Sequence, residues 1–182
     1  MLRLLAFLDM PDSGTVTLEY DGTLIVHSTH RGMKLMRHDR PHPIVLLMPQ
    51  EDALWPHLSM QENIDLARRP GGAAEKIDEW IDFLGVRSTL DSTPVKCSVG
   101  QRQRVELIRA LSAGPRLCLL DEPVAALDDG MEKMVERVIS DAATNLHIGF
   151  VIVSHSTEIL TAFNSVEFRL FKLNEGKLSP GD

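Results

Sequence analysis

Three short runs of apolar residues predict the strands of a sheet that is covered on both faces. The runs are residues 44–48, 117–120 and 150–153, and every position in them is apolar. Continuous apolarity is typical of buried strands in parallel sheets. Polar residues follow each run within two positions. Because ligands collect where the strands of an open α/β sheet end, the pattern predicts a functional site at these ends.

Weaker patterns predict the remaining strands and turns. Alternating apolar residues over 15–26, interrupted by Asp21-Gly22, predict a strand or a hairpin. The polar segment 28–43 predicts a loop with a short helix. Beyond position 155 we expect another short helix, then a strand over 166–173 and a turn at 174–176.

Helical periodicity dominates between residues 51 and 99. A capping box of the form Ser-x-x-Glu opens one helix at residues 59–62, and a stripe with i, i+3, i+4, i+7 spacing runs up to Gly85. We therefore expect a helical subdomain over 51–99, inserted between two parts of an α/β core that span 1–50 and 100–182. The stripe consists of Ile77, Trp80, Ile81 and Leu84.

Two further helices are predicted in the second part of this core. Ser98 and Gln101 form another capping box, which opens a helix with one apolar face. Residues 131–142 carry an apolar stripe and predict the next helix. The apolar face of the first of these helices holds Val105, Ile108 and Leu111.

Composition limits the classes of function. The chain has 182 residues, 43% of them hydrophobic and 25% charged, as in an ordinary globular protein. Its formal charge of -7 argues against a general affinity for nucleic acid. The two cysteines provide no disulfide framework and are compatible with a reducing cytoplasm. No apolar run approaches the roughly 20 residues needed to cross a bilayer, so we expect membrane association only through a partner.

The adjacent carboxylates Asp121 and Glu122 are the strongest chemical signal, because they end an apolar strand directly before Pro123. One carboxylate can hold a hydrated Mg²⁺ ion while its neighbour takes a proton from an attacking water, as metal-assisted phosphoryl transfer requires. A plainer interpretation is that the two acids begin a loop and cap a nearby helix. These two residues alone leave both interpretations open.

Other motifs stand around this pair in a recognisable order. Gln50 comes first, then Cys97-Ser98-Val99-Gly100-Gln101, and after the pair come Asp128 and His155. In this order the chain resembles the nucleotide-binding subunit of an ABC transporter from residue 1 to about residue 176, with 97–101 as the signature and 117–122 as the Walker B motif. An ordered set of motifs is more specific than any single one.

The resemblance implies a fold, cofactors and partners. The implied fold is α/β: a P-loop NTPase core of the ABC type with a mostly parallel sheet flanked by helices, a helical insertion and an incomplete N-terminus. The implied function is hydrolysis of ATP with Mg²⁺ to drive a transporter, in particular a bacterial importer. Its partners would be a transmembrane permease subunit and a second nucleotide-binding subunit, in a homo- or heterodimer, with no nucleic acid. We expect it in the cytoplasm, attached to the inner membrane through the permease.

The resemblance also assigns roles to the residues at the strand ends. Glu122 is the implied general base and Asp121 the implied metal ligand. Gln50 corresponds to the Q-loop, whose amide reaches Mg²⁺ and the attacking water, and His155 would hydrogen-bond to the γ-phosphate. Taken alone, Gln50 could simply end a strand, and a single histidine in such a place is usually structural.

Four more residues are implied to serve the nucleotide of the second subunit. In the family, the segment with Ser98, Gly100 and Gln101 binds the γ-phosphate held by the other protomer, and Asp128 reaches across the dimer. Backbone amides and the dipole at a helix start do favour an anion. The same residues could be only a helix cap. Val99, where the family has glycine, restricts the backbone and could block close approach to a phosphate.

The phosphate-binding loop of the family, Gly-x-x-x-x-Gly-Lys-Ser/Thr, does not occur in the 182 residues. Residues 1–14 resemble the helix that follows the lysine of this loop, so we expect a truncated chain that is inactive by itself. Two alternatives to a transporter ATPase stay open. One is a degenerate cassette without ATPase activity that acts as a structural or regulatory partner, and the other is a non-transport ABC ATPase of the DNA-repair or translation type.

Overall fold

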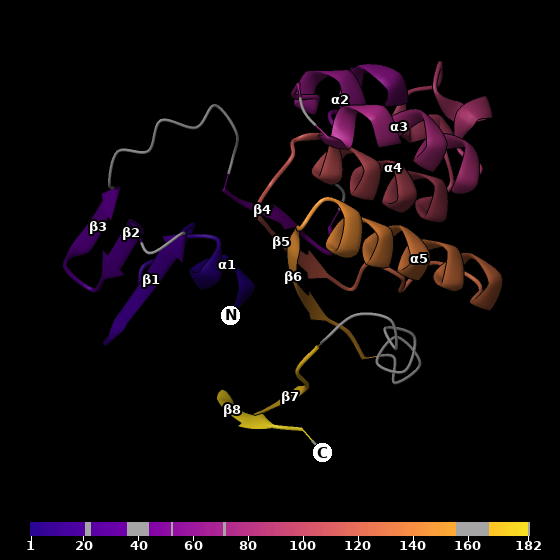
Figure 1. Ribbon diagram of the computed structural model, residues 1–182. Coiled ribbons are helices and arrows are strands. Elements are labelled where there is room, and N and C mark those ends of the chain that lie inside the picture. The colour runs from indigo at the N-terminus through magenta and orange to yellow at the C-terminus, as the bar shows by residue number, and fades with distance from the viewer. Residues whose placement is uncertain (21–22, 36–43, 52, 71, 156–167, 182) are drawn as a thin grey trace.

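A parallel sheet of three strands lies at the centre of the structure (Figure 1). The computed structural model describes residues 1–20, 23–35, 44–51, 53–70, 72–155 and 168–181. Within this part of the chain the sheet has the order β4-β5-β6, and its strands are the three predicted apolar runs. These strands are β4 (Val45–Met48), β5 (Leu117–Asp121) and β6 (Gly149–Val153).

Burial of the sheet follows from the position of each strand. β5 lies between the other two, and its residues Cys118, Leu119 and Leu120 are fully buried. Burial raises the pKa of the Cys118 thiol to about 12, so this side chain stays protonated and serves packing. β4 and β6 are half-buried at most positions, because each pairs with only one strand among the described residues. The prediction of strands covered on both faces is therefore confirmed for β5 and is too strong for the other two.

Four helices pack together on one side of the sheet (Figure 1). They are α2 (Met60–Ala67), α3 (Gly72–Phe83), α4 (Val99–Ser112) and α5 (Asp129–Asn145). Short 3-10 turns at Arg87–Thr89 and Pro94–Lys96 connect α3 to α4. The helices and β5 share one hydrophobic cluster, which contains the whole predicted stripe Ile77, Trp80, Ile81 and Leu84.

The predicted helix starts are confirmed. Ser59 and Glu62 form a capping box at α2, and Ser98 and Gln101 form one at α4. The chain leaves the α3 region at Gly85, whose φ of 63° is accessible at little cost only to glycine. Two residues of the stripe predicted for α5, Met131 and Met134, are half-buried. The other four are buried: Val135, Val138, Ile139 and Ala142.

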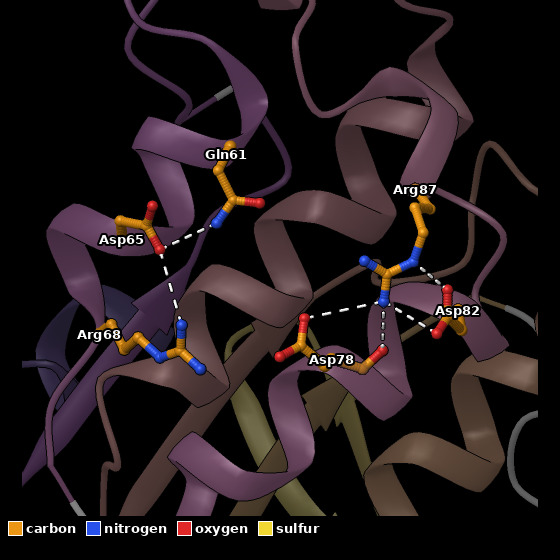
Figure 2. Close-up of polar contacts among 6 residues, drawn as sticks. All are labelled: Gln61, Asp65, Arg68, Asp78, Asp82 and Arg87. Carbon is orange, nitrogen blue, oxygen red and sulfur yellow. Dashed lines mark hydrogen bonds and ion pairs between the residues drawn. The ribbon is translucent and has the colours of Figure 1, made fainter.

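Short-range polar contacts line the exposed side of the helical segment (Figure 2). The amide of Gln61 donates to Asp65 at 2.9 Å on α2. Beyond the end of α3, Arg87 donates to the Asp82 carboxylate at 2.8 Å and to the Asp78 carbonyl at 3.2 Å. Because these groups are exposed, such contacts stabilise the fold only slightly.

An antiparallel sheet and the short helix α1 (Leu2–Leu5) lie on the opposite side of the parallel sheet (Figure 1). β1 (Thr15–Tyr20) and β2 (Thr23–Thr29) form the predicted hairpin, although its turn at 21–22 lies outside the described residues. The expected loop and helix over 28–43 are wrong for residues 28–35, because β3 (Gly32–Leu35) pairs with β2. Pairing satisfies the backbone groups of this polar segment, which periodicity alone does not reveal. Residues 36–43 lie outside the described chain.

A second hairpin ends the structure. β7 (Phe171–Asn174) and β8 (Lys177–Pro180) are antiparallel and are joined at Glu175 and Gly176. Both turn residues have positive φ, 49° and 78°, as in a two-residue type I′ turn. The predicted turn is confirmed, and the described part of the predicted strand begins at Phe171. Residues 156–167, where we expected a short helix and the start of that strand, are outside the description.

No helix in the described ranges is long and apolar enough to cross a membrane.

Candidate functional site

The register of the parallel sheet brings the predicted site residues to one edge. Met48 pairs with Leu120, and Leu120 pairs with Ile152, so the three strands end side by side. Gln50 follows β4 after one residue and is exposed. Asp121 is the last residue of β5 and is half-buried. The strand ends therefore gather as predicted, with polar groups from all three strands at the same edge.

Glu122 is the most constrained residue of this edge. Its backbone N–H donates to the Val153 carbonyl at 2.9 Å, in the last pair of the β5–β6 ladder, Asp121 with Val153. Its side chain is buried, and its Oε1 accepts a hydrogen bond from the backbone N–H of His155 at 2.8 Å. Oε2 accepts from the Ser154 hydroxyl at 3.3 Å. The carboxylate is thus held in place by donors from the end of the neighbouring strand.

The His155 imidazole is exposed to solvent beside this buried carboxylate. The side chain is fully exposed, and its Nε2 lies 3.8 Å from Glu122 Oε1. At that distance the two groups form an ion pair only when the imidazole is protonated. The backbone of His155 therefore serves Glu122, whereas its ring is accessible to a ligand at the strand ends.

The segment after Gln50 is held by helix α4. Glu106 Oε1 accepts from the Ala53 N–H, and Arg109 Nη1 donates to the Ala53 carbonyl, both at 2.5 Å. The Arg109 guanidinium also lies 4.3 Å from the centre of the Trp55 ring, a cation–π distance. Neither Glu106 nor Arg109 was predicted as a site residue. Their positions on α4 were predictable, but contact with a segment 53 or 56 residues away was not.

The start of α4 uses its polar groups internally. Ser98 Oγ accepts from the Gln101 N–H at 3.2 Å, and Gln101 Oε1 accepts from the Ser98 N–H at 2.9 Å. The helix-cap interpretation of this segment is therefore confirmed, while its role toward a phosphate stays a prediction. Val99 is 57% exposed. Gly100 lies against the segment after Glu122, and a Cβ there would be 3.1 Å from the Ala126 carbonyl oxygen.

Asp128 caps the helix that follows the carboxylate pair. Its side chain accepts from the Met131 N–H at 3.0 Å at the start of α5, and the residue is exposed. The plainer interpretation of Asp121 and Glu122 is correct in that a loop begins where β5 ends, and wrong in that Asp128 caps the next helix. Its role across a dimer is not tested by a single chain and stays a prediction.

Gln103 is the residue that the sequence analysis missed beside Glu122. Its Nε2 donates to the Glu122 carbonyl at 2.7 Å, and its Oε1 accepts from the Ala126 N–H at 3.4 Å. Gln103 lies two residues after the signature, but nothing local indicates which side chain of this helix reaches the loop after β5.

The donor groups at this edge fit a magnesium ion that shares its coordination with a phosphate ligand. Among the described residues, no cluster of three or more histidine, cysteine or acidic side chains could hold a metal by itself. The Asp121 carboxylate and the Gln50 amide follow neighbouring strands and offer oxygen ligands. Mg²⁺ is usually bound through one or two carboxylates together with substrate phosphates, so a sparse oxygen set is what such a site requires.

Comparison with known proteins identifies similar chains. Residues 1–125 match the family model described as ABC transporter. The molybdenum import ATP-binding protein ModC of Rhizobium etli is 36% identical, over 98% of this chain and 48% of the relative. The Fe(3+) ions import ATP-binding protein FbpC 2 of Pectobacterium atrosepticum is 33% identical, over 98% of this chain and 49% of the relative. The chain thus spans about half the length of these curated relatives.

A similar solved structure is an ATP-binding cassette in a dimeric post-hydrolysis state with ADP and Pi. It superposes with a TM-score of 0.72 at 22% sequence identity, covering 98% of this chain and 78% of that one. At this identity the likeness establishes the fold alone, and it confirms the predicted α/β architecture.

Proposed function

Since the chain belongs to the ABC transporter family, we propose that it is the ATP-binding and ATP-hydrolysing subunit of a bacterial importer. The observation that carries the proposal is the edge where β4, β5 and β6 end. A buried carboxylate, a half-buried carboxylate, an amide and an exposed imidazole stand at or just after these strand ends: Glu122, Asp121, Gln50 and His155. This set can bind a metal, accept a proton and contact a phosphate, the three tasks of phosphoryl transfer to water.

Each of these residues has a distinct proposed role. Bound Mg²⁺ and ATP supply the transferable phosphoryl group and the charge neutralisation that its transfer needs. Asp121 and the Gln50 amide would hold the metal, and Gln50 would also orient the attacking water. Glu122 takes the proton from that water, and its orientation is set by the His155 N–H. The His155 ring, which is exposed, would donate to the γ-phosphate.

The remaining predicted residues serve assembly. We assign Ser98, Gly100 and Gln101 to the nucleotide of a second nucleotide-binding subunit, and Asp128 to contact across that dimer. The exposure of Ser98 and Asp128 supports this assignment. A permease subunit would attach the protein to the cytoplasmic face of the inner membrane. The names of the relatives, which are import proteins for molybdenum and Fe(3+) ions, support an importer.

The test of the proposed chemistry is Glu122→Gln in the natural protein isolated with its membrane partner. The amide keeps the shape of the side chain but cannot take the proton, so ATP binding should persist while turnover falls by about 100-fold or more. An ATP-bound dimer should then accumulate in gel filtration. Asp121→Asn should instead weaken the Mg²⁺ dependence. Glu75→Gln, on an exposed position of α3, is the control. Turnover of Glu122→Gln at the unmutated rate would contradict the proposal.

The direction of transport needs a separate experiment in cells. Loss of the protein should lower uptake of molybdenum or Fe(3+), measured as metal content after growth in limiting amounts of each. Unchanged content of both metals would reject the substrates of these relatives without affecting the assignment of ATPase activity.

One observation favours a second candidate, a cassette that binds a partner without hydrolysing ATP. The exposed Val99 carries a β-branched side chain next to Ser98, and the Ser98 hydroxyl and Gln101 N–H bond to each other. Both features hinder an approaching phosphate. Stoichiometric assembly with the permease but no nucleotide turnover, in the unmutated protein, would select this candidate.

A further inference from the structure

Helix α4 braces the loop that carries Glu122. Gln103, on the second turn of α4, bonds to both ends of the turn after β5: its Nε2 to the Glu122 carbonyl at 2.7 Å and its Oε1 to the Ala126 N–H at 3.4 Å. Gly100, one turn earlier, lets the helix approach, because a Cβ there would meet the Ala126 carbonyl oxygen at 3.1 Å. The glutamine amide suits this position because it offers one donor and one acceptor side by side.

Glu122 needs such a brace because of its backbone conformation. Its φ of 51° lies in the left-handed region, which is unfavourable for a residue with a Cβ and persists only when surrounding contacts hold it. Contacts at each of its polar groups hold it. The N–H donates to Val153, and the carboxylate accepts from the His155 N–H and the Ser154 hydroxyl. The carbonyl accepts from Gln103 at 2.7 Å and from the Ala125 N–H, within the same turn, at 3.3 Å. Gln103 provides the contact that comes from a helix rather than from the neighbouring strand.

We propose that Gln103 is a positioning residue for Glu122: it fixes the backbone turn from which the carboxylate reaches the end of β6. This inference rests on the proposed function for its catalytic meaning, since Glu122 is the proposed base. Gln103 itself contacts no reacting group. Because α4 begins at the Ser98 cap, the same helix connects the segment proposed to face the second subunit with the proposed base.

Hydrogen exchange of the His155 amide tests the positioning directly. This amide donates to Glu122 Oε1 and has no bond to Gln103, so it reports where the carboxylate lies. In Gln103→Leu, which removes donor and acceptor, we expect the His155 amide to exchange about 10-fold faster or more, with the α4 interior amides unchanged. Gln61→Leu, the same change on α2, is the matched control, because its amide bonds to Asp65 (Figure 2).

Two outcomes would overturn the inference. One is unchanged exchange at His155 in Gln103→Leu. The other is equal acceleration at His155 and in the α4 interior, which would mean general destabilisation. Gln103→Glu serves as the second variant, because it keeps the length and the acceptor but loses the donor to Glu122. It should accelerate His155 exchange as the leucine does, while α4 stays protected.

Kinetics on the natural protein with its membrane partner then measure the consequence. A displaced base should lower kcat by about 10- to 100-fold and leave KM for ATP within a factor of about two, since misplacement by an ångström has effects of this size. An unchanged kcat in Gln103→Leu would contradict the role in positioning. If the unmutated protein does not turn over ATP, the proposed function fails, and the exchange experiment still decides whether Gln103 positions Glu122.

Discussion

At the level of single residues, Gly100 is a position where close packing, independently of any ligand, leaves no room for a side chain. The family resemblance gives this glycine a role near phosphate, but the structure places it against Ala126 and Leu127. A Cβ at this position would lie 3.1 Å from the Ala126 carbonyl oxygen and 3.1 Å from Leu127 Cδ2. The glycine is therefore needed for close contact between α4 and the loop after β5, whatever else it does.

We predict that Gly100→Ala destabilises the fold by about 1 kcal/mol. Overpacking against a backbone carbonyl costs about 1–3 kcal/mol, and the better helix propensity of alanine offsets up to about 1 kcal/mol of this. Gly130→Ala is the matched control in the first turn of α5, where the new Cβ would meet only the Asp128 side chain at 3.3 Å. Urea unfolding of both variants provides the measurement. Equal stability of the two variants would show that the loop at Ala126 shifts to make room for the new Cβ without lowering the free energy of unfolding.

Glu136 makes the stability of the folded protein depend on pH. Burial, and then the charge of Glu132 four residues earlier on α5, raise the pKa of the Glu136 carboxyl. A carboxyl whose pKa is higher in the folded than in the unfolded state binds its proton more tightly when folded. Its contribution to stability is therefore full below the unfolded pKa and is lost as the pH rises through the folded pKa.

Glu136→Gln should accordingly stabilise the protein at pH 7, and the gain should disappear near pH 4. The like-charge pair alone accounts for about 0.2–0.5 kcal/mol, and burial adds to it. Thermal unfolding at the two pH values measures the difference. Glu75→Gln, at an exposed position of α3, should change stability by less than about 0.5 kcal/mol at both. A loss of stability in Glu136→Gln at pH 7 would mean that the carboxylate has a favourable ionic partner.

At the scale of elements, β6 is one of the two edge strands of the parallel sheet within the described residues. Among the described residues it pairs with β5 alone, and the half-buried residues 150–153 are all apolar. The Gly149 N–H donates to Arg116, toward β5, and amides of a strand alternate in direction. The amides of Phe150 and Ile152 therefore point away from β5. An apolar strand with unpaired backbone groups is prone to association.

Hydrogen exchange within β6 tests this geometry with an internal control. We expect the amides of Phe150 and Ile152 to exchange at least about 10-fold faster than those of Val151 and Val153. The two sets come from the same strand, so global unfolding affects them equally. Equal protection of all four amides would show that a further strand or segment covers this edge.

At the scale of the whole molecule, the helical segment and the sheet form one hydrophobic core. The cluster that contains Ile64 and Ile77 also contains Leu120 and Ile139. Polar contacts add to it between α3 and α5. The Trp80 indole N–H donates to Asp141 Oδ2 at 3.2 Å, and Lys76 Nζ lies 3.4 Å from Asp141 Oδ1. We therefore expect the helices and the parallel sheet to unfold in one transition.

Asp141→Ala should lower the stability of this unit by about 1–3 kcal/mol, because the indole N–H of Trp80, a residue only 2% exposed, would lose its acceptor. Asp78→Ala on the exposed side of α3 removes a carboxylate near Arg87 and should cost less than about 1 kcal/mol. Fluorescence and far-UV circular dichroism should report the same midpoint in both variants. Two separated transitions would mean that the helical segment folds independently.

Most of the elements are predictable from local signals in the sequence. The apolar runs predicted β4, β5 and β6, because continuous apolarity is typical of strands in parallel sheets, although only the central strand β5 is largely buried. The stripe up to Leu84 and the boxes at Ser59 and Ser98 predicted helices and their starts, since periodicity and capping act within a few residues. The order of motifs also sufficed to identify the family.

The contacts that hold the site, in contrast, form only in the folded chain. Glu122 bonds to a residue 33 positions away, Gln103 reaches 19 positions to the Glu122 carbonyl, and Glu106 reaches 53 positions to Ala53. The left-handed backbone of Glu122 exists because such contacts outweigh its local preference. Pairing of β3 likewise depends on its neighbour. Contacts of this kind arise only after chain segments far apart in sequence have packed, so residue type and spacing cannot specify them.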